Sequence, residues 1–297
     1  MSLVINHNLM SMNAARNLNE SYNSLSTSTN RLSSGLRVNS AADDAAGLAI
    51  RELMRSDIST IYQGTRNAND AISLIQTADG ALGVIDEKLI RMKELAEQAA
   101  TGTYTSAQRL IIDSEYQAMA SEISRIANAT DFNGIYLLNG NLSGADHDGN
   151  GLNATGALRI HFGTGNDSKE DYYDIQIGAA TAEKFGLGMN ADPTASGRSI
   201  STQSLAQNAL DALNEAIISK DNIRASLGAL QNRLEATVSN LEIQAENLQA
   251  AESRISDVDV ATEMTEFTRQ QIKTQSAVAM LAQANSLPEM AMQLIQG

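Results

Sequence analysis

The sequence predicts a mainly α fold, in which both ends of the chain make a long, coiled-coil-like helical rod and a small β-hairpin region lies between them. Three observations predict this fold. Apolar residues recur with heptad spacing near both termini. Strict alternation of apolar and polar residues is confined to a short central stretch. Only two prolines occur in 297 residues, so the helices can run long without interruption.

The N-terminal helix is predicted from one heptad stripe, whose alternating spacings of four and three are typical of a coiled-coil seam. The stripe consists of Leu18, Tyr22, Leu25, Thr29, Leu32 and Leu36. Most residues between these positions are Asn, Ser or Thr, which are weak helix formers. We therefore expect the helix to be marginal in water unless it packs against other helices.

A break at residues 33–39 separates this helix from a second, longer one. Ser40 and Asp43 have capping-box spacing, which predicts the second helix start. Apolar residues continue on one face as far as Ala99, and a turn is expected at residues 101–104. Thr105 and Gln108 then form a second capping box, so the next helix should fold back as an antiparallel hairpin.

The pattern changes at about residue 131, where Asn133-Gly134 and Asn139-Gly140 are turn dipeptides. Two alternating runs further on predict a small β-hairpin. They are Leu158, Ile160 and Phe162, and then Tyr173, Ile175 and Ile177. Helical spacing returns from Ser199 to Ile255.

A third capping box, Ser256 with Asp259, predicts the last helix start. The apolar residues of this helix are Met264, Phe267, Val278 and Leu281, in a heptad frame whose middle positions are Gln271 and Thr274.

The order of these elements is nearly symmetric about the centre, so we expect the two thin terminal helices to pair. The predicted organisation has three parts. Residues 1–35 and 258–297 form a terminal coiled-coil layer. Residues 36–140 and 199–257 form a separate helical bundle, and residues 141–198 form a short loop and β-hairpin region. The pair of thin terminal helices has one narrow apolar stripe and no globular core, so we expect it to be stable only where many copies pack together.

Composition argues against several classes of partner and chemistry. The formal net charge of −14 disfavours nucleic acids and anionic membranes. The chain lacks cysteine, has no secretory leader pattern at residues 1–16 and has no apolar run long enough to cross a bilayer. Asp146 to Gly151 copies half of a calcium loop, but Ala157 stands where the bidentate glutamate belongs.

Other candidate sites are also weak. The acidic group Asp257, Asp259, Glu263 and Glu266 is better explained as a solvated first helical turn than as a metal site. We expect no catalytic residues, no metal and no cofactor, because no nucleophile, base and orienting group occur in a recognisable pattern.

The chain resembles bacterial flagellin over essentially its full length. The matching stretches are NRLSSGLRVNSAADDAAGLAI, QTADGALGVIDEKLIRMKELAEQAATGTY, DFNGIYLLNG and ESRISDVDVATEMTEFTRQQIKTQSAVAMLAQANSLPEMAMQLI. Several long stretches in the right order make this a specific resemblance.

The resemblance implies a structural subunit that is exported unfolded through the flagellar secretion channel and self-assembles into the extracellular filament. It implies that the terminal coiled-coil layer is the inner layer of the filament, that the helical bundle is the outer one, and that residues 141–198 are a variable region. It also implies partners: further copies of the chain, an export chaperone at the segment from about Val258, hook-associated and cap proteins, and a host Toll-like receptor. The receptor contact motif corresponds to Arg91, Leu95 and Glu115. The alternatives are a hook–filament junction protein, which shares such termini, and a cytoplasmic signalling coiled coil, which would need a membrane anchor.

Overall fold

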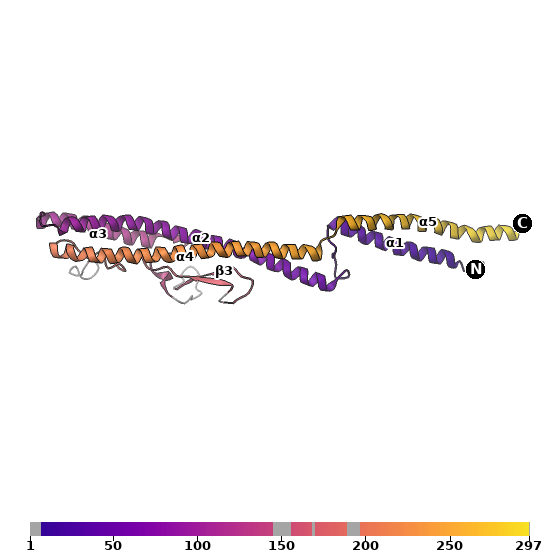
Figure 1. Ribbon diagram of the computed structural model, residues 1–297, viewed down its shortest axis with the longest axis horizontal. Helices are drawn as coiled ribbons and strands as arrows, with labels where there is room; N and C mark the ends of the chain where they lie inside the picture. The colour runs from indigo at the N-terminus through magenta and orange to yellow at the C-terminus, as the bar shows by residue number, and fades with distance from the viewer. Residues whose placement is uncertain (1–6, 145–155, 168–169, 189–196, 297) are drawn as a thin grey trace. The chain divides into compact units, whose positions relative to one another are not determined.

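The computed structural model describes residues 7–144, 156–167, 170–188 and 197–296, and side chains only as far as residue 290 in the last range. Within these ranges the mainly α prediction is confirmed (Figure 1). The helices are α1 (Leu9–Ser34), α2 (Ala45–Ala100), α3 (Ser106–Ala129), α4 (Gln203–Ser256) and α5 (Val260–Gln296), with a short 3-10 helix η1 (Asn141–Ser143).

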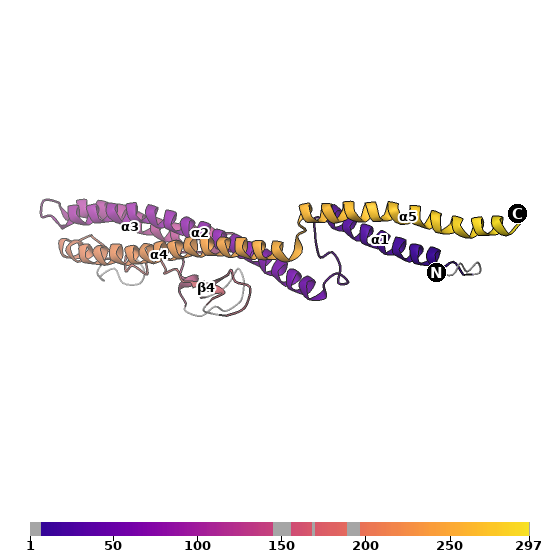
Figure 2. The ribbon, with the colours of Figure 1, turned by 45° about the vertical axis from the view of Figure 1, so that its right-hand side comes forward.

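The chain folds as two compact units. The first contains residues 1–58 and 246–297, and the second contains residues 59–245. In the first unit α1 and α5 lie side by side, as Figures 1 and 2 show. In the second unit α2, α3 and α4 share a core of apolar side chains, to which the central region adds.

The core of the second unit follows from the helical spacing of its apolar residues. Leu82, Ile85 and Leu89 on α2 are fully buried, as are Ile123 on α3 and Leu213 on α4. At roughly 1.5–3 kcal/mol for each large apolar side chain removed from water, such a core stabilises the bundle strongly.

The α2–α3 hairpin forms as predicted. The side chain of Thr105 accepts a hydrogen bond from the Gln108 backbone, and the Gln108 side chain accepts one from the Thr105 backbone, so this capping box is confirmed. The buried guanidinium of Arg109 donates to the carbonyl oxygens of Ala99 (2.9 Å) and Thr101 (2.8 Å). Arg109 thus satisfies carbonyls that the end of α2 leaves without partners.

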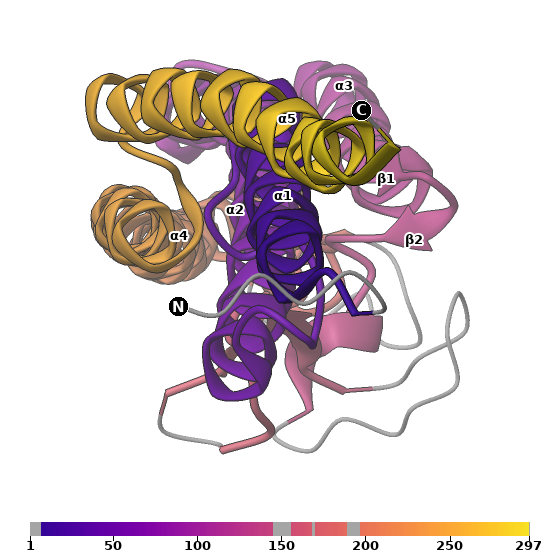
Figure 3. The same ribbon diagram turned by 90° about the vertical axis from the view of Figure 1, so that its right-hand side faces the viewer.

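The predicted turn at Asn133-Gly134 is also confirmed. It joins β1 (Asp131–Phe132) to β2 (Ile135–Tyr136), which pair antiparallel beyond the end of α3 (Figure 3). Both turn residues have positive φ, 52° at Asn133 and 82° at Gly134, as a two-residue hairpin turn requires.

The central β-hairpin is confirmed as well. β3 (Leu158–His161) pairs antiparallel with β4 (Tyr172–Ile175), with Leu158 opposite Ile175 and Ile160 opposite Tyr173. The hairpin packs on the helices: Asn67 on α2 donates to the carbonyl of His161 at 2.8 Å.

The Ser40–Asp43 capping box is wrong as a helix start. The Asp43 carboxylate accepts a hydrogen bond from the Ser40 backbone N–H (2.9 Å) and closes a turn. Asp44 caps the helix instead, because its Oδ1 accepts from the Gly47 backbone N–H at 2.9 Å, and α2 begins at Ala45. Two adjacent aspartates offered two possible caps, and the second one is used.

The Ser256–Asp259 capping box is wrong for a similar reason. Helix α4 continues through Ser256. The Asp259 Oδ1 accepts from the backbone N–H groups of Ala261 (3.0 Å) and Thr262 (3.3 Å), so Asp259 is the N-cap of α5. The two helices are therefore separated by three residues, 257–259.

Candidate assembly surface

Helices α1 and α5 run antiparallel. At one end the Asn8 side-chain Nδ2 donates to the Ala284 carbonyl at 2.7 Å. Toward the other end Arg31 and Glu263 form an ion pair with an N–O distance of 3.7 Å. The predicted pairing of the two terminal helices is thus present within one chain.

Backbone hydrogen bonds close this pair beyond the last turn of α1. Gly35, with φ 73°, ends the helix in the left-handed region, and its carbonyl accepts from Val258 N–H at 3.0 Å. Leu36 and Asp257 form an isolated antiparallel bridge, and Arg37 N–H donates to the Ser256 carbonyl at 2.6 Å. The two interhelical connections are therefore joined directly to each other.

The most buried positions of the contact between α1 and α5 are occupied by small and polar side chains. The buried residues on these helices are Ser21, Ser28, Gln270, Thr274 and Ala284, each at most 9% exposed. Small residues along a helical seam allow the two backbones to approach closely. They also contribute little apolar burial, so the seam stabilises the pair weakly.

On α1 the buried row is one residue away from the predicted one. Leu18, Leu25 and Leu32 are half-buried, as expected for one side of a seam. The other side is Ser21 with Ser28, whereas Tyr22, which the heptad stripe placed there, keeps 55% of its surface exposed.

The same one-residue shift occurs on α5. Phe267 and Leu281 are half-buried, and Thr274 between them is buried. The second row of the seam contains Gln270 and Ala284, whereas Met264 and Val278 are 47% and 49% exposed. Leu36, the last residue of the predicted stripe, lies beyond the end of α1 and is half-buried.

The heptad pattern predicts the more apolar of two neighbouring rows as the seam, whereas the chain buries the less apolar row internally. The apolar row that is left over faces away from the seam. Further exposed apolar side chains on the two helices accompany it: Leu9, Met10, Met12, Val260, Ile272, Met280 and Met290. Exposed apolar surface on this scale is typical of an interaction surface.

The predicted receptor-contact residues lie in the second unit, and two of the three are brought together. Arg91 on α2 donates to the Glu115 carboxylate on α3 through Nε (3.0 Å) and Nη2 (2.8 Å), and to Glu94 through Nη1 (2.9 Å). These bonds, that to Glu115 foremost, raise the pKa of the Arg91 guanidinium.

Leu95 does not present an exposed apolar contact beside this pair. Its side chain is only 2% exposed and belongs to the core that α2 shares with α3 and α4. The Leu95 side chain is therefore not exposed in the single chain, and its assignment as a receptor contact stays a prediction from the resemblance.

Comparison with known proteins identifies the family. Residues 5–143 match the model of the bacterial flagellin N-terminal helical region, and residues 210–295 match that of the bacterial flagellin C-terminal helical region. A flagellin from Halalkalibacterium halodurans is 42% identical over 300 residues, which cover 99% of this chain and 100% of that protein. The chain belongs to the bacterial flagellin family.

Other relatives of this flagellin are named as flagellins or as flagellar filament core proteins. Flagellin FlaB2 of Treponema pallidum is 39% identical over 294 residues, covering 99% of this chain and 100% of that protein. The flagellar filament core protein flaB2 of Brachyspira hyodysenteriae is 39% identical over 296 residues, with the same coverage. This flagellin is a structural subunit that self-assembles into the extracellular flagellar filament. The hook–filament junction alternative has less support.

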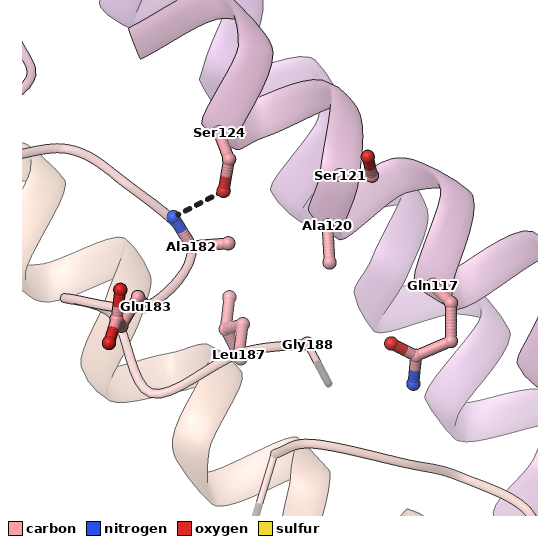
Figure 4. A pocket seen from close by; sticks show the side chains of 8 residues that line it. All are labelled: Gln117, Ala120, Ser121, Ser124, Ala182, Glu183, Leu187 and Gly188. Carbon is pink, nitrogen blue, oxygen red and sulfur yellow. Dashed lines mark hydrogen bonds between the residues drawn. The ribbon is translucent and has the colours of Figure 1, made fainter. Parts of the chain in front are cut away.

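A cavity of about 330 Å³ lies between α3 and residues 182–188 of this flagellin (Figure 4). Its lining is Gln117, Ala120, Ser121, Ser124, Ala182, Glu183, Leu187 and Gly188. Ser124 Oγ accepts a hydrogen bond from the Ala182 N–H at 3.3 Å, so the serine holds the loop against the helix. Glu183 is the one ionisable side chain of this lining, which offers hydrogen bonds but no acid–base pair.

The described part of the chain has neither a metal-site cluster nor a helix able to span a membrane. It contains no group of three or more His, Asp or Glu side chains placed to hold a metal ion. The acidic residues at the start of α5 have other roles: Asp259 caps the helix, and Glu263 pairs with Arg31. The calcium-like stretch from Asp146 to Gly151 lies outside the described residues. None of the helices described is both long and apolar enough to cross a bilayer.

Proposed function

We propose that filament assembly by this flagellin is a coupled folding reaction, in which the outward apolar row of α1 and α5 is buried by neighbouring copies. The observation that carries this proposal is that the buried row of the α1–α5 seam lies one residue away from a more apolar row, which stays exposed. The chain uses small, polar Ser21, Ser28, Gln270 and Thr274 for its internal seam and leaves Tyr22, Met264 and Val278 exposed.

The energetics favour assembly over an isolated pair. Ordering a residue costs about 1–2 kcal/mol of backbone entropy. Among the described residues, the fully buried positions of the internal seam hold Ser, Gln, Thr and Ala, and its large apolar side chains stay half-buried, so burial within one chain offsets only part of that cost. Each large apolar side chain that a neighbour covers contributes roughly 1.5–3 kcal/mol. The terminal pair therefore gains its stability from several neighbours at once, which makes polymerisation cooperative.

The geometry of such contacts would extend a polymer without closing it. The apolar row of one chain meets a different surface on its neighbour, which is a heterologous contact and generates a helical filament unless the rotation closes a ring. In this arrangement residues 1–35 and 258–297 form the inner layer of the filament, and residues 36–140 and 199–257 form the outer one. The central hairpin, β3 with β4, would lie on the outside of this outer layer.

Truncation tests this proposal. A chain lacking residues 1–35 should lose polymerisation, because α5 then has neither its partner nor half of the apolar surface. The far-ultraviolet circular dichroism and thermal unfolding that report on the second unit should persist, since its core lies within residues 59–245. Normal filaments from the truncated chain, seen by electron microscopy, would refute the proposal.

Export requires that the same surface be covered before assembly. We infer that the chain travels unfolded through the flagellar secretion channel and that an export chaperone binds the segment from about Val258. Val260, Met264, Ile272 and Val278 on α5 are each about half-exposed or more, and they are the side chains that such a chaperone would cover. Hook-associated and cap proteins would meet the same termini at the two ends of the filament.

We also propose that a host Toll-like receptor reads the Arg91–Glu115 pair on the free subunit. Both side chains are partly exposed, at 49% and 44%, and belong to neighbouring helices. An Arg91→Ala chain should activate a receptor reporter cell line less than the parent chain does. Arg125→Ala, which removes an exposed pair with Glu122 on α3 alone, is the matched control. Equal activation by intact and depolymerised filaments would contradict recognition of the free subunit.

A further inference from the structure

Helix α5 contains a proline in its interior, Pro288. Proline has no backbone N–H, so the carbonyl four residues earlier, that of Ala284, has no donor from its own helix. An unpaired carbonyl at a buried position costs free energy comparable to a lost hydrogen bond. Ala284 is 5% exposed, which makes solvation of this carbonyl by bulk water poor.

The missing donor comes from the other end of the chain. Asn8 Nδ2 donates to the Ala284 carbonyl at 2.7 Å. The same side chain is the N-cap of α1, because its Oδ1 accepts from the Ser11 backbone N–H at 3.0 Å. A carbonyl can only accept and a backbone N–H can only donate, so the orientation of the Asn8 amide is fixed by its two partners.

We propose that Asn8 is the positioning residue that sets the register of α1 against α5, by pairing with the carbonyl that Pro288 leaves free. The rest of the seam specifies register poorly. Ser21 and Ser28 are seven residues apart, as are Leu18 and Leu25, so a slip of one heptad places similar side chains in similar positions. Such a slip moves the helices about 10 Å along each other and leaves the Ala284 carbonyl unpaired.

A neighbouring contact supports the same register. Ser11 Oγ donates to Asn285 Oδ1 at 2.8 Å; Ser11 lies three residues after Asn8, and Asn285 is next to Ala284. A single polar residue that fixes the register of a helical pair is a known device in coiled coils. Here its partner is a backbone carbonyl, which a proline has made available at one position.

The inference rests on the proposed coupling of terminal ordering to assembly, and a double-mutant cycle on the full-length chain tests it separately. Asn8→Ser keeps a good N-cap but removes the amide donor. Pro288→Ala restores the helix donor to the Ala284 carbonyl. We expect Asn8→Ser to raise the critical concentration for polymerisation about tenfold in the parent chain. In the Pro288→Ala background the same substitution should change it less than about twofold.

The control is Asn17→Ser, at an exposed position on α1, which should leave the critical concentration unchanged. Two outcomes would overturn the inference: Asn8→Ser has no effect in the parent chain, or it is equally harmful in both backgrounds. Neither outcome touches the proposed coupled assembly, which is tested separately by the chain without residues 1–35.

Cross-linking measures the register itself, because the chain has no cysteine of its own. Arg31→Cys and Glu263→Cys place two thiols at the site of the Arg31–Glu263 pair, within reach of a short bismaleimide linker. In filaments, the intramolecular cross-link should form efficiently with Asn8 and Pro288 both present. The yield of this cross-link should fall in the Asn8→Ser chain and in the Pro288→Ala chain. An undiminished yield in both variants would refute a role in register.

Discussion

The ammonium of Lys220 on α4 lies 2.5 Å from the Asp86 carboxylate on α2 and 2.7 Å from Asp221. One turn further along α4, Arg224 donates to Asp79 on α2 at 2.7 Å. Burial acts against the charged ammonium, but the hydrogen bonds to Asp221 and Asp86 outweigh it and raise the pKa of Lys220. These two pairs hold α2 and α4 together beside the apolar core.

Breaking the Lys220–Asp86 pair from the acidic side should destabilise the second unit. Asp86→Ala leaves the 2%-exposed Lys220 with Asp221 as its remaining carboxylate, and we expect a loss of about 1–3 kcal/mol in the free energy of unfolding. Lys220→Met removes the buried charge together with its desolvation penalty, so it should lower the free energy of unfolding by less than about 1 kcal/mol. Urea unfolding of the unassembled full-length chain measures both. A larger loss for Lys220→Met than for Asp86→Ala would contradict this account.

Gly64 is required where the central hairpin packs on α2. A Cβ added there would lie 2.0 Å from the Phe162 carbonyl oxygen, so Gly64→Ala should displace the hairpin from the helix. We expect faster proteolysis between residues 158 and 175 and lower stability of the second unit. Gly80→Ala, on the same helix with no atom within 4 Å of the added Cβ, is the control. It should stabilise the chain by about 0.5–1 kcal/mol. Equal effects of the two substitutions would refute the tight contact.

The fold of the second unit could be predicted from the sequence to a large extent, because the capping box, the turn dipeptide and the helical spacing of apolar residues all indicate the same structure. Thr105 and Gln108 can satisfy each other only at a helix start, and Asn133-Gly134 can adopt the two positive φ angles that a hairpin turn needs. The sequence pattern predicts the wrong helix start where two carboxylates that could each cap the helix are adjacent, as at Asp43 and Asp44.

The terminal seam could not be predicted to the residue, and the reason is physical. Heptad spacing gives the period of a seam but does not tell which of two adjacent rows faces which partner. The apolar row containing Tyr22 fits a partner helix well, but in this chain that row faces away from α5, and Ser21 faces it. The bond between Asn8 and Ala284 depends on tertiary contact across the chain, so no local pattern indicates it.

Enlarging a small seam residue should prevent the terminal helices from pairing. Ser28 is 3% exposed against α5, and Ser28→Leu would overfill the contact at a cost of about 1–3 kcal/mol. We expect a higher critical concentration for polymerisation and lower filament yield on sedimentation. Ser26→Leu adds the same apolar side chain at an exposed position of α1 and should have a smaller effect. Equal losses for both would show that packing in the seam is not the cause.

Removing the outward apolar side chains should weaken assembly without affecting the second unit. Tyr22→Ser and Val278→Ser should each raise the critical concentration, because each deletes a side chain that a neighbouring copy is proposed to cover. The thermal unfolding of the second unit should stay the same. Thr29→Ser, in the same heptad row as Tyr22 but already polar, serves as control. Unchanged polymerisation of the Tyr22 and Val278 variants would contradict the proposal that neighbouring copies bury these side chains.

Acid should loosen the two connections at the ends of the terminal helices. Hydrogen bonds from Ser40 lower the pKa of Asp43 from its ordinary value of 3.8, and those from Thr262 do the same for Asp259. A carboxyl with a lowered pKa contributes its full stabilisation above the unfolded value. That contribution is lost as the pH falls through the lower folded-state value.

We therefore expect the amides of residues 39–44 and 259–263 to lose hydrogen-exchange protection below about pH 4. In an Asp43→Asn, Asp259→Asn chain, this acid-dependent part should be reduced, because the amide does not titrate in this range. Identical pH profiles for the two chains would exclude these carboxyls as the cause.

The offset between the two rows makes the free subunit sensitive to a very small change in length. Successive residues of an α-helix are turned by about 100°, so deleting one residue ahead of Ser21 rotates all that follows in α1 by that angle. Tyr22 would then face α5 in place of Ser21. The same rotation would carry Leu25 and Leu32 out of the seam and bring Ser26 and Ser33 into their places. Such a subunit would bury part of the surface that it now offers to other copies and expose leucines that it now covers, so it would be a poorer building block.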